Sequence, residues 1–349
     1  MESHLMELPR KILIGYGVLS RLGEFLKNLD LNGKVLIISG ENVKKRLGNR
    51  VEDSLITHEF NFLWYCAKEA TINEVKRVEE FAKSKGVSVI LGVGGGKSID
   101  IAKLTASNMN LPFVSVPTSA SHDGISSPFA SIKGLNRPYS IISRPPIGIL
   151  GDIDVIYEAP KRLLASGCGD LIAKITAVKD WELARDIKKE YFGNYAANLA
   201  RMSAEIVIKE SEGIGKGLKE CVRDVVEALI SAGVAAGIAG SSRPCSGSEH
   251  LFSHALSIIA PNAGLHGERC GIGTIMIAKL YGMDWESLRK SLLNIHAPTS
   301  AMEIGVSEEQ VVEALLLAST IRPDRFTILN VKKLDYESAL KLARSTYVT

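Results

Sequence analysis

Three histidines in the C-terminal half of the chain have a spacing that could bind a divalent metal ion. They are His250, His254 and His266, and the first two fall within an expected helix. Residues four positions apart share one face of a helix, so these two imidazoles would point the same way. A turn at residues 261–264 could bring His266 back toward His250, and Asp170 could add a carboxylate. Because catalytic zinc usually keeps three protein ligands and one open position, these residues indicate a catalytic metal site.

The spacing alone leaves other interpretations of these histidines open. Histidines often only pack in the interior or lie at the surface, and Glu249 and Glu268 are carboxylates closer in sequence than Asp170. The zinc-protease pattern requires a glutamate directly after its first histidine, but Leu251 follows His250. We therefore expect a metal site that is not of the zinc-protease type.

A glycine-rich turn in the N-terminal part of the chain predicts a phosphate-binding site. Residues 92–98, Gly-Val-Gly-Gly-Gly-Lys-Ser, follow an expected strand and open an expected helix. Glycines let a ligand approach the backbone, and the first amides of a helix bind phosphate. The Walker A pattern fails at Leu91 and the usual dinucleotide fingerprint fails at Lys97, since each needs glycine there. The turn indicates a phosphate ligand without identifying the nucleotide, and a tight turn with no ligand is the alternative.

Polar residues also follow the next expected strand. Residues 116–124 read Val-Pro-Thr-Ser-Ala-Ser-His-Asp-Gly. Ligands bind at the carboxyl ends of the strands in open α/β sheets, so this loop could contact one. The candidates are Thr118, Ser119, Ser121, His122 and Asp123. The alternative is a loop whose side chains hydrogen-bond only to its own backbone.

A parallel sheet and a set of helices must position these residues. In the first half of the chain, β-branched runs alternate with helical patterns, with strands expected at 34–39, 87–93 and 113–116 and helices at 73–85 and 98–108. Such alternation is typical of a parallel sheet covered by helices. A further strand pair is expected within 131–150. Helical patterns then dominate, at 161–186, 193–210, 217–239, 248–259, 271–281 and 307–319. We expect an α/β, Rossmann-like N-terminal domain (residues 1–155) and an all-α C-terminal domain (residues 156–349).

Composition and charge exclude several classes of protein. The 349 residues are 46% hydrophobic and 23% charged, which argues against a disordered or fibrous chain. Lys and Arg number 42 against 39 Asp and Glu, so a net charge of +3 gives no strong field to attract nucleic acid. No apolar run reaches the roughly 18 residues of a membrane span, and the first ten residues lack a signal-peptide pattern. Five scattered cysteines without a Cys-x-x-Cys pair indicate a reducing cytoplasm.

Five motifs, in order along the chain, resemble the iron/zinc-dependent polyol dehydrogenase superfamily, which includes glycerol dehydrogenase and is similar to dehydroquinate synthase. They are Gly-Gly-Gly-Lys-Ser-Ile-Asp at 94–100, Pro-Thr-Ser-Ala-Ser-His-Asp at 117–123, Gly-Asp at 169–170, the segment 250–254, and His-Gly-Glu at 266–268. The most specific is the 117–123 loop with the Ser-Ser-Pro that follows at 126–128. The resemblance spans residues 34 to about 273 and is strongest to the archaeal sn-glycerol-1-phosphate dehydrogenases. It implies a dehydroquinate synthase-like fold with a cleft between an α/β and a helical domain.

The resemblance also implies a role for each motif residue. The pyrophosphate of NAD(H) or NADP(H) would lie on Gly94, Gly95, Gly96, Lys97 and Ser98. The nicotinamide side of the dinucleotide would contact Thr118, Ser119, Ala120, Ser121 and Ser127. One Zn²⁺ per subunit would bind to Asp170, His250 and His266. Asp123 and His254 would contact the substrate and act in catalysis, with Asp170 beside the substrate. His254 is then not a metal ligand, although its spacing suggested one.

The implied activity is NAD(P)H-dependent reduction of dihydroxyacetone phosphate to sn-glycerol 1-phosphate, the backbone of archaeal membrane phospholipids. Zn²⁺ would polarise the carbonyl and the nicotinamide would carry the hydride. One alternative is a metal-dependent glycerol dehydrogenase acting on an unphosphorylated polyol. A lyase of the dehydroquinate synthase type would need several basic groups, which loop 121–127 lacks. A non-enzymatic nucleotide-binding module would leave the three metal-site residues without a role.

Cofactor preference and phosphate binding remain open at this stage. Glycerol dehydrogenase relatives imply a carboxylate after the first strand, where this chain has Gly40 followed by Glu41, Lys44 and Lys45. The missing carboxylate predicts that NADPH is accepted as well as NADH. Candidates for the substrate phosphate are Lys133, Arg137 and Arg144. We expect a cytoplasmic homo-oligomer that acts on a small molecule and has neither a nucleic-acid partner nor a membrane span. The sequence fixes neither the copy number nor the metal used in the cell.

Overall fold

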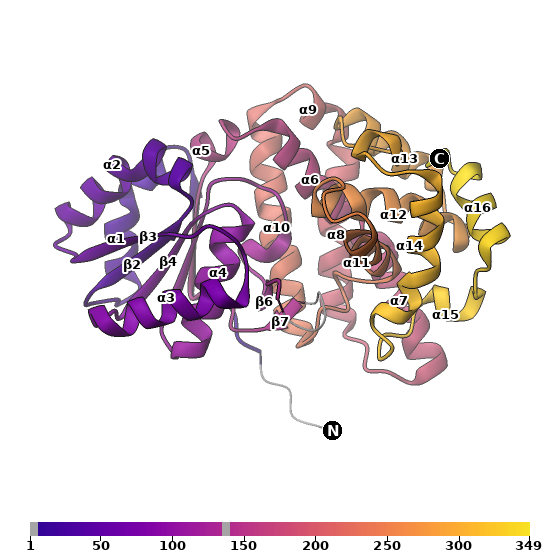
Figure 1. Cartoon of the computed structure of the whole chain (residues 1–349). Coiled ribbons are helices and arrows are strands. Elements are labelled where there is room, and N and C mark those ends of the chain that lie inside the picture. The colour runs from indigo at the N-terminus through magenta and orange to yellow at the C-terminus, as the bar shows by residue number, and fades with distance from the viewer. Residues whose placement is uncertain (1–5, 135–139) are drawn as a thin grey trace. The chain divides into compact units, whose positions relative to one another are not determined.

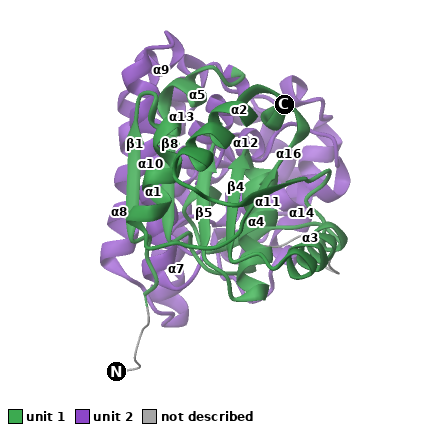
Figure 2. Ribbon diagram, turned by 90° about the vertical axis from the view of Figure 1, so that its left-hand side faces the viewer, with its two compact units in different colours: residues 1–120, 124–160 green, residues 121–123, 161–349 purple. Residues whose placement is uncertain are grey.

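The computed structural model describes residues 6–134 and 140–349. The chain divides into two compact units, which Figure 2 shows in different colours. The first contains residues 1–120 and 124–160, and the second contains residues 121–123 and 161–349. The short segment 121–123 therefore belongs with the second unit although the chain on both sides of it belongs with the first.

A six-stranded parallel sheet organises the first unit (Figure 1). Its strands are β1 (Lys11–Gly15), β2 (Val35–Ser39), β3 (Phe62–Cys66), β4 (Val89–Gly94), β5 (Phe113–Pro117) and β8 (Gly148–Asp152). Their order across the sheet is β1-β8-β5-β4-β2-β3. Every residue of β2, β4, β5 and β8 is buried, as expected for parallel strands covered on both faces.

Helices between the strands supply that cover. They are α1 (Leu22–Asn28), α2 (Glu41–Thr57), α3 (Ile72–Lys85), α4 (Gly96–Met109) and α5 (Ile153–Tyr157). Side chains of β2 and β4 form one hydrophobic core with side chains of α1 and α2, among them Ile37, Leu91, Phe25 and Leu55. The α4 helix packs on β4 and β5 and against α3. This arrangement is the α/β, parallel-sheet unit that the sequence predicts.

The strands expected at 34–39, 87–93 and 113–116 are β2, β4 and β5, which confirms those predictions. The sequence pattern did not reveal β1 and β3, the two edge strands of the sheet. Every residue of β3 is partly exposed, as expected at a sheet edge, although its sequence, Phe-Leu-Trp-Tyr-Cys, is as apolar as that of a central strand. Within 131–150, β6 (Phe129–Ser131) and β7 (Ser140–Ile142) form a short antiparallel pair, whereas β8 joins the main sheet.

Lys103 fixes the segment that follows β5. Its side chain is fully buried, and Nζ donates hydrogen bonds to the carbonyl oxygens of Gly124 at 2.7 Å and Phe129 at 2.6 Å. The same ammonium lies 3.4 Å from Oδ1 of Asp100, one turn earlier on α4. The helix that starts at the glycine turn is thus tied to the end of the 116–124 loop through one buried cation.

The second unit is built from helices, and its described residues contain no strand. The helices are α6 (Lys161–Ile172), α7 (Lys174–Lys188), α8 (Asn194–Lys209), α9 (Ser211–Gly215), α10 (Lys219–Ala239), α11 (Ser248–Ile259), α12 (His266–Leu280), α13 (Trp285–Asn294), α14 (Glu308–Ile321), α15 (Ile328–Lys332) and α16 (Tyr336–Ser345). The α12 helix packs against both α6 and α11, and α11 packs against α14. The predicted all-α C-terminal domain is confirmed.

Two helix boundaries differ from the sequence prediction. The helix expected at 161–186 is interrupted at Ala173, where α6 ends and α7 begins; the apolar pattern continues across the break and does not reveal it. The α12 helix begins at His266, not at residue 271, because Glu268 Oε2 accepts the backbone N–H of Leu265 at 2.6 Å and closes the first turn. The corrected boundary places His266 at a helix N-terminus.

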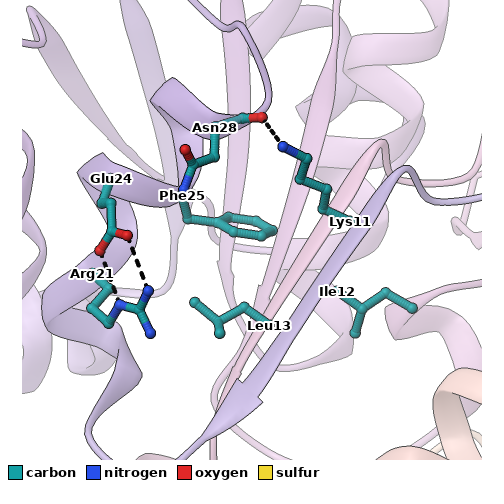
Figure 3. A pocket seen from close by; sticks show the side chains of 7 residues that line it. All are labelled: Lys11, Ile12, Leu13, Arg21, Glu24, Phe25 and Asn28. Carbon is teal, nitrogen blue, oxygen red and sulfur yellow. Dashed lines mark hydrogen bonds and ion pairs between the residues drawn. The ribbon is translucent and has the colours of Figure 1, made fainter.

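A shallow hollow lies beside the edge strand β1 (Figure 3). It is lined by residues of β1 and α1 and by Arg21 just before α1, with Ile12, Leu13 and Phe25 as its apolar part. Lys11 Nζ hydrogen-bonds to the Asn28 carbonyl, and Arg21 pairs with Glu24 at 2.9 Å. None of the predicted site residues lines this hollow.

Among the described helices, none is both long enough and apolar enough to cross a membrane. The prediction that the chain has no membrane span is therefore consistent with the described part of the structure.

Candidate functional site

The second unit brings Asp170, His250 and His266 together from three helices. Nε2 of His250 lies 3.3 Å from Oδ1 of Asp170, and Nε2 of His266 lies 3.9 Å from the same oxygen. With the Cys270 thiol, their donor atoms all lie within 4.8 Å of one another. Zinc binds nitrogen and oxygen ligands at roughly 2.0–2.2 Å, so donor atoms about 3–4 Å apart can share one ion. The geometry fits a divalent metal held by two imidazoles and a carboxylate.

Glu249 orients the imidazole of His250. Oε1 of Glu249 lies 2.8 Å from Nδ1 of His250, and this carboxylate also accepts the Gly247 N–H at 2.7 Å and the Thr176 hydroxyl at 2.8 Å. Burial opposes ionisation, but the bond to His250 outweighs it and lowers the pKa of Glu249. Because Nδ1 faces Glu249, Nε2 is the ring nitrogen that faces Asp170, and it is the one that a metal ion shared with Asp170 would use.

Lys174 links the metal-site carboxylate to Asp123. Its fully buried ammonium lies 2.8 Å from Oδ1 of Asp170 and 2.7 Å from Oδ2 of Asp123. The backbone N–H of Asp123 donates to Oδ2 of Asp170 at 3.0 Å. These contacts explain why residues 121–123 belong with the second unit, and they place the predicted substrate residue Asp123 beside Asp170.

The charges in this cluster stabilise one another against burial. Burial favours the neutral form of Asp170, but Lys174 and His250 hold the pKa of its carboxyl well below the usual value. Burial likewise opposes the charge of Lys174, but Asp123 and Asp170 hold the pKa of its ammonium well above the usual value. Asp170 is therefore an ionised carboxylate, which is the form that binds a metal.

Two glycines let α6 and α12 approach closely enough to bring the ligands together. A Cβ on Gly169, next to Asp170, would lie 2.3 Å from the Gly267 carbonyl oxygen. A Cβ on Gly267, next to His266, would lie 1.8 Å from the Ser166 carbonyl oxygen. Both distances are far below van der Waals contact with rigid backbone, so only glycine fits at either position.

His254 lies near this cluster but outside the converging donor atoms. Its ring centroid is 6.5 Å from that of His250 and 6.1 Å from that of His266. Removal from water, followed by the charges of His250 and three arginines, lowers the pKa of His254 to about 3. The imidazole is thus neutral at ordinary pH, with one ring N–H that can donate.

The first unit places the glycine turn beside the start of the 116–124 loop. Gly94 has φ +153°, a conformation that favours glycine, and Gly95 precedes α4 without any side-chain cap. The Thr118 N–H donates to the Gly94 carbonyl at 3.0 Å, and a Cβ on Gly95 would lie 3.2 Å from Ser119 Oγ. Ser119 Oγ is buried and has no hydrogen-bond partner among the described residues. A cradle with free helix amides and an unsatisfied hydroxyl fits a pyrophosphate.

The remaining predicted cofactor residues differ from one another in exposure and in hydrogen bonding. Gly96 and Ser98 lie in the first turn of α4, while Lys97 is exposed and donates to the Lys68 carbonyl at 2.8 Å. Ala120 and Ser127 are buried. Ser121 belongs to the second unit, where its carbonyl lies 3.4 Å from Ser166 Oγ. Their contact with a dinucleotide stays a prediction.

The predicted phosphate candidates lie in the first unit or outside the described residues. Lys133 is exposed, and Arg144 Nη1 hydrogen-bonds to the Asn110 side chain. Arg137 falls outside the described residues. Gly40 is the N-cap of α2, directly after β2, and a Cβ there would meet no atom within 4 Å.

Several residues of the site were missed by the sequence analysis. Lys174 is four residues after Asp170 and Cys270 four after His266, a spacing that could have revealed both. Glu249 was noted only as a nearby carboxylate, whereas it orients His250. Arg269, Arg322 and Arg325 carry no recognisable pattern, and only the fold shows that their charges act on His254.

Comparison with known proteins connects this geometry with a family. Residues 13–160 match the family model of iron-containing alcohol dehydrogenases. The chain is 53% identical over 348 residues to glycerol-1-phosphate dehydrogenase (NAD(P)+) of Nitrosopumilus maritimus (strain SCM1), covering 100% of this chain and 98% of that protein. It is 49% identical over 345 residues to the enzyme of the same name from Pyrococcus horikoshii, covering 99% of both chains. The chain belongs to the glycerol-1-phosphate dehydrogenase family.

Solved structures agree on the fold of this family. Glycerol dehydrogenase from Schizosaccharomyces pombe superimposes with a TM-score of 0.82 at 24% identity, covering 99% of this chain and 91% of that one. NADH-dependent butanol dehydrogenase A from Thermotoga maritima gives 0.75 at 21% identity, covering 99% and 98%. These likenesses confirm the predicted dehydroquinate synthase-like architecture.

Replacing Glu249 by glutamine tests its hold on the metal ligand. The neutral amide polarises His250 less than a carboxylate does, so zinc affinity should fall by about 10- to 100-fold. The measurement is competition for zinc against a chelating dye. Glu313→Gln, at an exposed position of α14, is the matched control and should leave the affinity unchanged. Equal affinities of the two variants would contradict the orienting role of Glu249.

Replacing Gly267 by alanine tests the close approach of α6 and α12. The added Cβ must push the helices apart, which should lower the free energy of unfolding by about 1–3 kcal/mol and weaken zinc binding. Urea denaturation and the same zinc competition measure the two effects. Gly48→Ala is the control, because a Cβ there meets its nearest atom at an ordinary 3.7 Å. A Gly267→Ala protein with full stability and full zinc affinity would refute the constraint.

Proposed function

We propose that the chain reduces dihydroxyacetone phosphate to sn-glycerol 1-phosphate with NADH or NADPH, using one divalent metal ion, zinc, bound by Asp170, His250 and His266. The observation that carries the proposal is the convergence of these three side chains in a chain that aligns over its full length with glycerol-1-phosphate dehydrogenases. When bound, the metal would polarise the substrate carbonyl and the nicotinamide would supply the hydride.

The protein side chains orient the substrate and handle its proton. The Asp123 carboxylate, held in place by Lys174, is positioned to accept a hydrogen bond from a substrate hydroxyl. The neutral His254 has a ring N–H that can be donated, directly or through water, to the oxygen that gains charge during reduction. The low pKa of His254 suits this role, because a neutral imidazole adds no positive charge beside the metal.

The nucleotide part of the proposal rests on the glycine turn and the neighbouring loop. Gly94, Gly95, Gly96, Lys97 and Ser98 would bind the pyrophosphate, and Thr118, Ser119, Ala120, Ser121 and Ser127 would contact the nicotinamide side. The unsatisfied hydroxyl of Ser119 beside Gly95 supports this assignment. The assignment of the pyrophosphate rests on the general principle that backbone amides at the start of a helix bind phosphate groups.

We also propose that the protein acts in the cytoplasm as a homo-oligomer. All five cysteines are free thiols, which suits a reducing compartment. Tyr195, Met202 and Ile206 lie along one face of α8 and are 71%, 49% and 36% exposed. An exposed apolar stripe of this kind supports contact with a second copy of the chain.

An NADH oxidation assay with dihydroxyacetone phosphate tests the activity directly. The protein should oxidise NADH with this substrate, lose activity after chelation and regain it when zinc is returned. Turnover of glycerol with NAD⁺ should be poor by comparison. Efficient glycerol oxidation without turnover of dihydroxyacetone phosphate would favour a glycerol dehydrogenase instead.

Replacing Gly40 by aspartate tests the basis of cofactor choice. The site has room for the side chain, and its φ of −85° suits any residue. A carboxylate there would accept the ribose 2′-hydroxyl of NADH and repel the 2′-phosphate of NADPH. The ratio of kcat/KM for NADPH to that for NADH should fall about 10-fold or more. Gly40→Asn matches the size without the charge, so a similar fall in that variant would contradict the explanation.

A further inference from the structure

Two arginines of the second unit contact the helix that carries His250 and His254. Nε of Arg269 lies 3.2 Å from Oγ of Ser253, and Nη1 donates to the Ala263 carbonyl at 2.7 Å. Arg325 hydrogen-bonds to the Ser246 carbonyl just before α11, and its Nη2 donates to Ser242 Oγ at 2.8 Å. One guanidinium therefore lies beside the middle of α11 and the other beside its start.

Arg322 adds a third positive charge to this cluster. It follows the last residue of α14, which packs along α11, and it is three residues before Arg325. Its Nη2 pairs with Asp324 Oδ2 at 3.2 Å, and that carboxylate is 67% exposed. The charges of Arg269, Arg322 and Arg325 all reach His254, since each lowers the pKa of that imidazole. We call these three residues the arginine cluster.

The positive charge of the arginine cluster is poorly neutralised. Arg325 is 5% exposed, and within the described residues neither it nor Arg269 forms an ion pair with a carboxylate. Neighbouring Arg243 shows the contrast, because it is equally buried but binds Glu190 through both Nε and Nη2. Carboxylates act on the cluster from a greater distance, Glu190 and Asp324 on Arg325 and Glu268 on Arg269. Glu190 and Glu268 are already paired with Arg243 and Arg162, so the cluster keeps the capacity to bind a further anion.

We propose that the arginine cluster binds the phosphate group of the triose phosphate substrate. The proposal rests on the function proposed above, which places the substrate carbonyl at Asp170, His250 and His266. In dihydroxyacetone phosphate only a carbon and an ester oxygen separate the carbonyl carbon from phosphorus. The phosphate must therefore lie next to the metal-site residues, where His254 lies and where Arg269 contacts the adjacent Ser253.

The chemistry of the cluster suits a phosphate monoester. Guanidinium groups bind phosphate oxygens through parallel charge-assisted hydrogen bonds. Arg269 is anchored through Nε and Nη1, and its Nη2 makes no hydrogen bond within the described residues. Arg269 also lies three residues after His266 on α12, so it occupies the same helix face as a metal ligand.

Guanidinium groups could equally bind the 2′-phosphate of NADPH. The position of the arginine cluster favours the substrate phosphate over this 2′-phosphate. All three arginines lie in the second unit, around the helix that carries His250. The 2′-phosphate belongs to the adenosine half of the nucleotide, next to the pyrophosphate that the glycine turn of the first unit would bind. Binding of the NADPH 2′-phosphate is one of the outcomes that the experiment below distinguishes.

The first measurement is binding of inorganic phosphate to the metal-free protein with saturating NADH present, so that the glycine turn is filled. Calorimetry should show that Arg322→Gln and Arg269→Gln each weaken phosphate binding by about 10-fold or more. Arg201→Gln is the matched control, because Arg201 is 33% exposed and pairs with one carboxylate, Glu182, at 2.7 Å. Phosphate affinity equal to that of the control in both cluster variants would overturn the proposal.

The second measurement compares dihydroxyacetone phosphate with dihydroxyacetone as substrates of the zinc-loaded enzyme. The ratio of their kcat/KM values should fall by about 10- to 100-fold in Arg322→Gln, because only the phosphorylated substrate loses a contact. A misfolded or distorted site would lower both values together and leave the ratio unchanged, which would count against the proposal. A loss confined to NADPH, with no change in the substrate ratio, would assign the cluster to the 2′-phosphate instead.

These measurements separate the subsite from the proposed function. If the wild-type enzyme reduces neither compound, the proposed function fails, yet phosphate binding and its loss in the variants still test the arginine cluster. If the wild type prefers the phosphorylated substrate and the variants keep that preference, the function stands and the cluster is not the subsite. Arg325→Gln is the third variant, to be read alongside a melting curve because its hydrogen bonds to Ser242 and Ser246 also hold the fold.

Discussion

Lys174, His250 and His266 all approach the buried carboxylate of Asp170. The arrangement of the site in the second unit follows from these contacts. An ionised carboxylate in the interior is tolerated only when charge and hydrogen bonds surround it. Lys174 supplies the charge, the Asp123 backbone supplies a hydrogen bond, and the two imidazoles approach from α11 and α12. Because of these contacts, residues 121–123 belong to the second unit although their neighbours in the chain belong to the first. The position of Asp123 is thus a consequence of the charge on Asp170.

The distribution of charge around this centre is uneven in a way that matches a phosphorylated ketone. On the side of Asp170 two carboxylates face one ammonium, so the net charge of these three groups is negative and favours a cation. On the side of His254 the surplus is positive, because Arg269 and Arg325 lack carboxylate partners among the described residues. A substrate with a polarisable carbonyl at one end and a dianion at the other complements both sides.

Much of this organisation could be predicted from sequence, for physical reasons that differ between elements. Fully buried strands such as β2 and β4 have continuous apolar runs, and the glycine turn before α4 has a composition that few other turns require. The edge strands β1 and β3 also carry apolar runs, at residues 12–14 and 62–66, and were missed although their sequences hold the same signal. The family motifs predict Asp170, His250 and His266 as metal ligands, and the structure brings these side chains together, but no local pattern shows that Glu249 orients His250. The arginine cluster was beyond prediction, because α12 and the end of α14 meet α11 only through tertiary packing.

Lys174 also stabilises the carboxylates of the site when no metal ion is bound. In small zinc domains the ligands repel one another or disorder without the ion, and the fold is lost with it. Here the Lys174 ammonium pairs with Asp170 and Asp123 from within the fold, so these carboxylates have a counter-charge that does not depend on a metal ion. The side chain of His266 is 38% exposed. We therefore expect the second unit to keep its fold when the metal is removed.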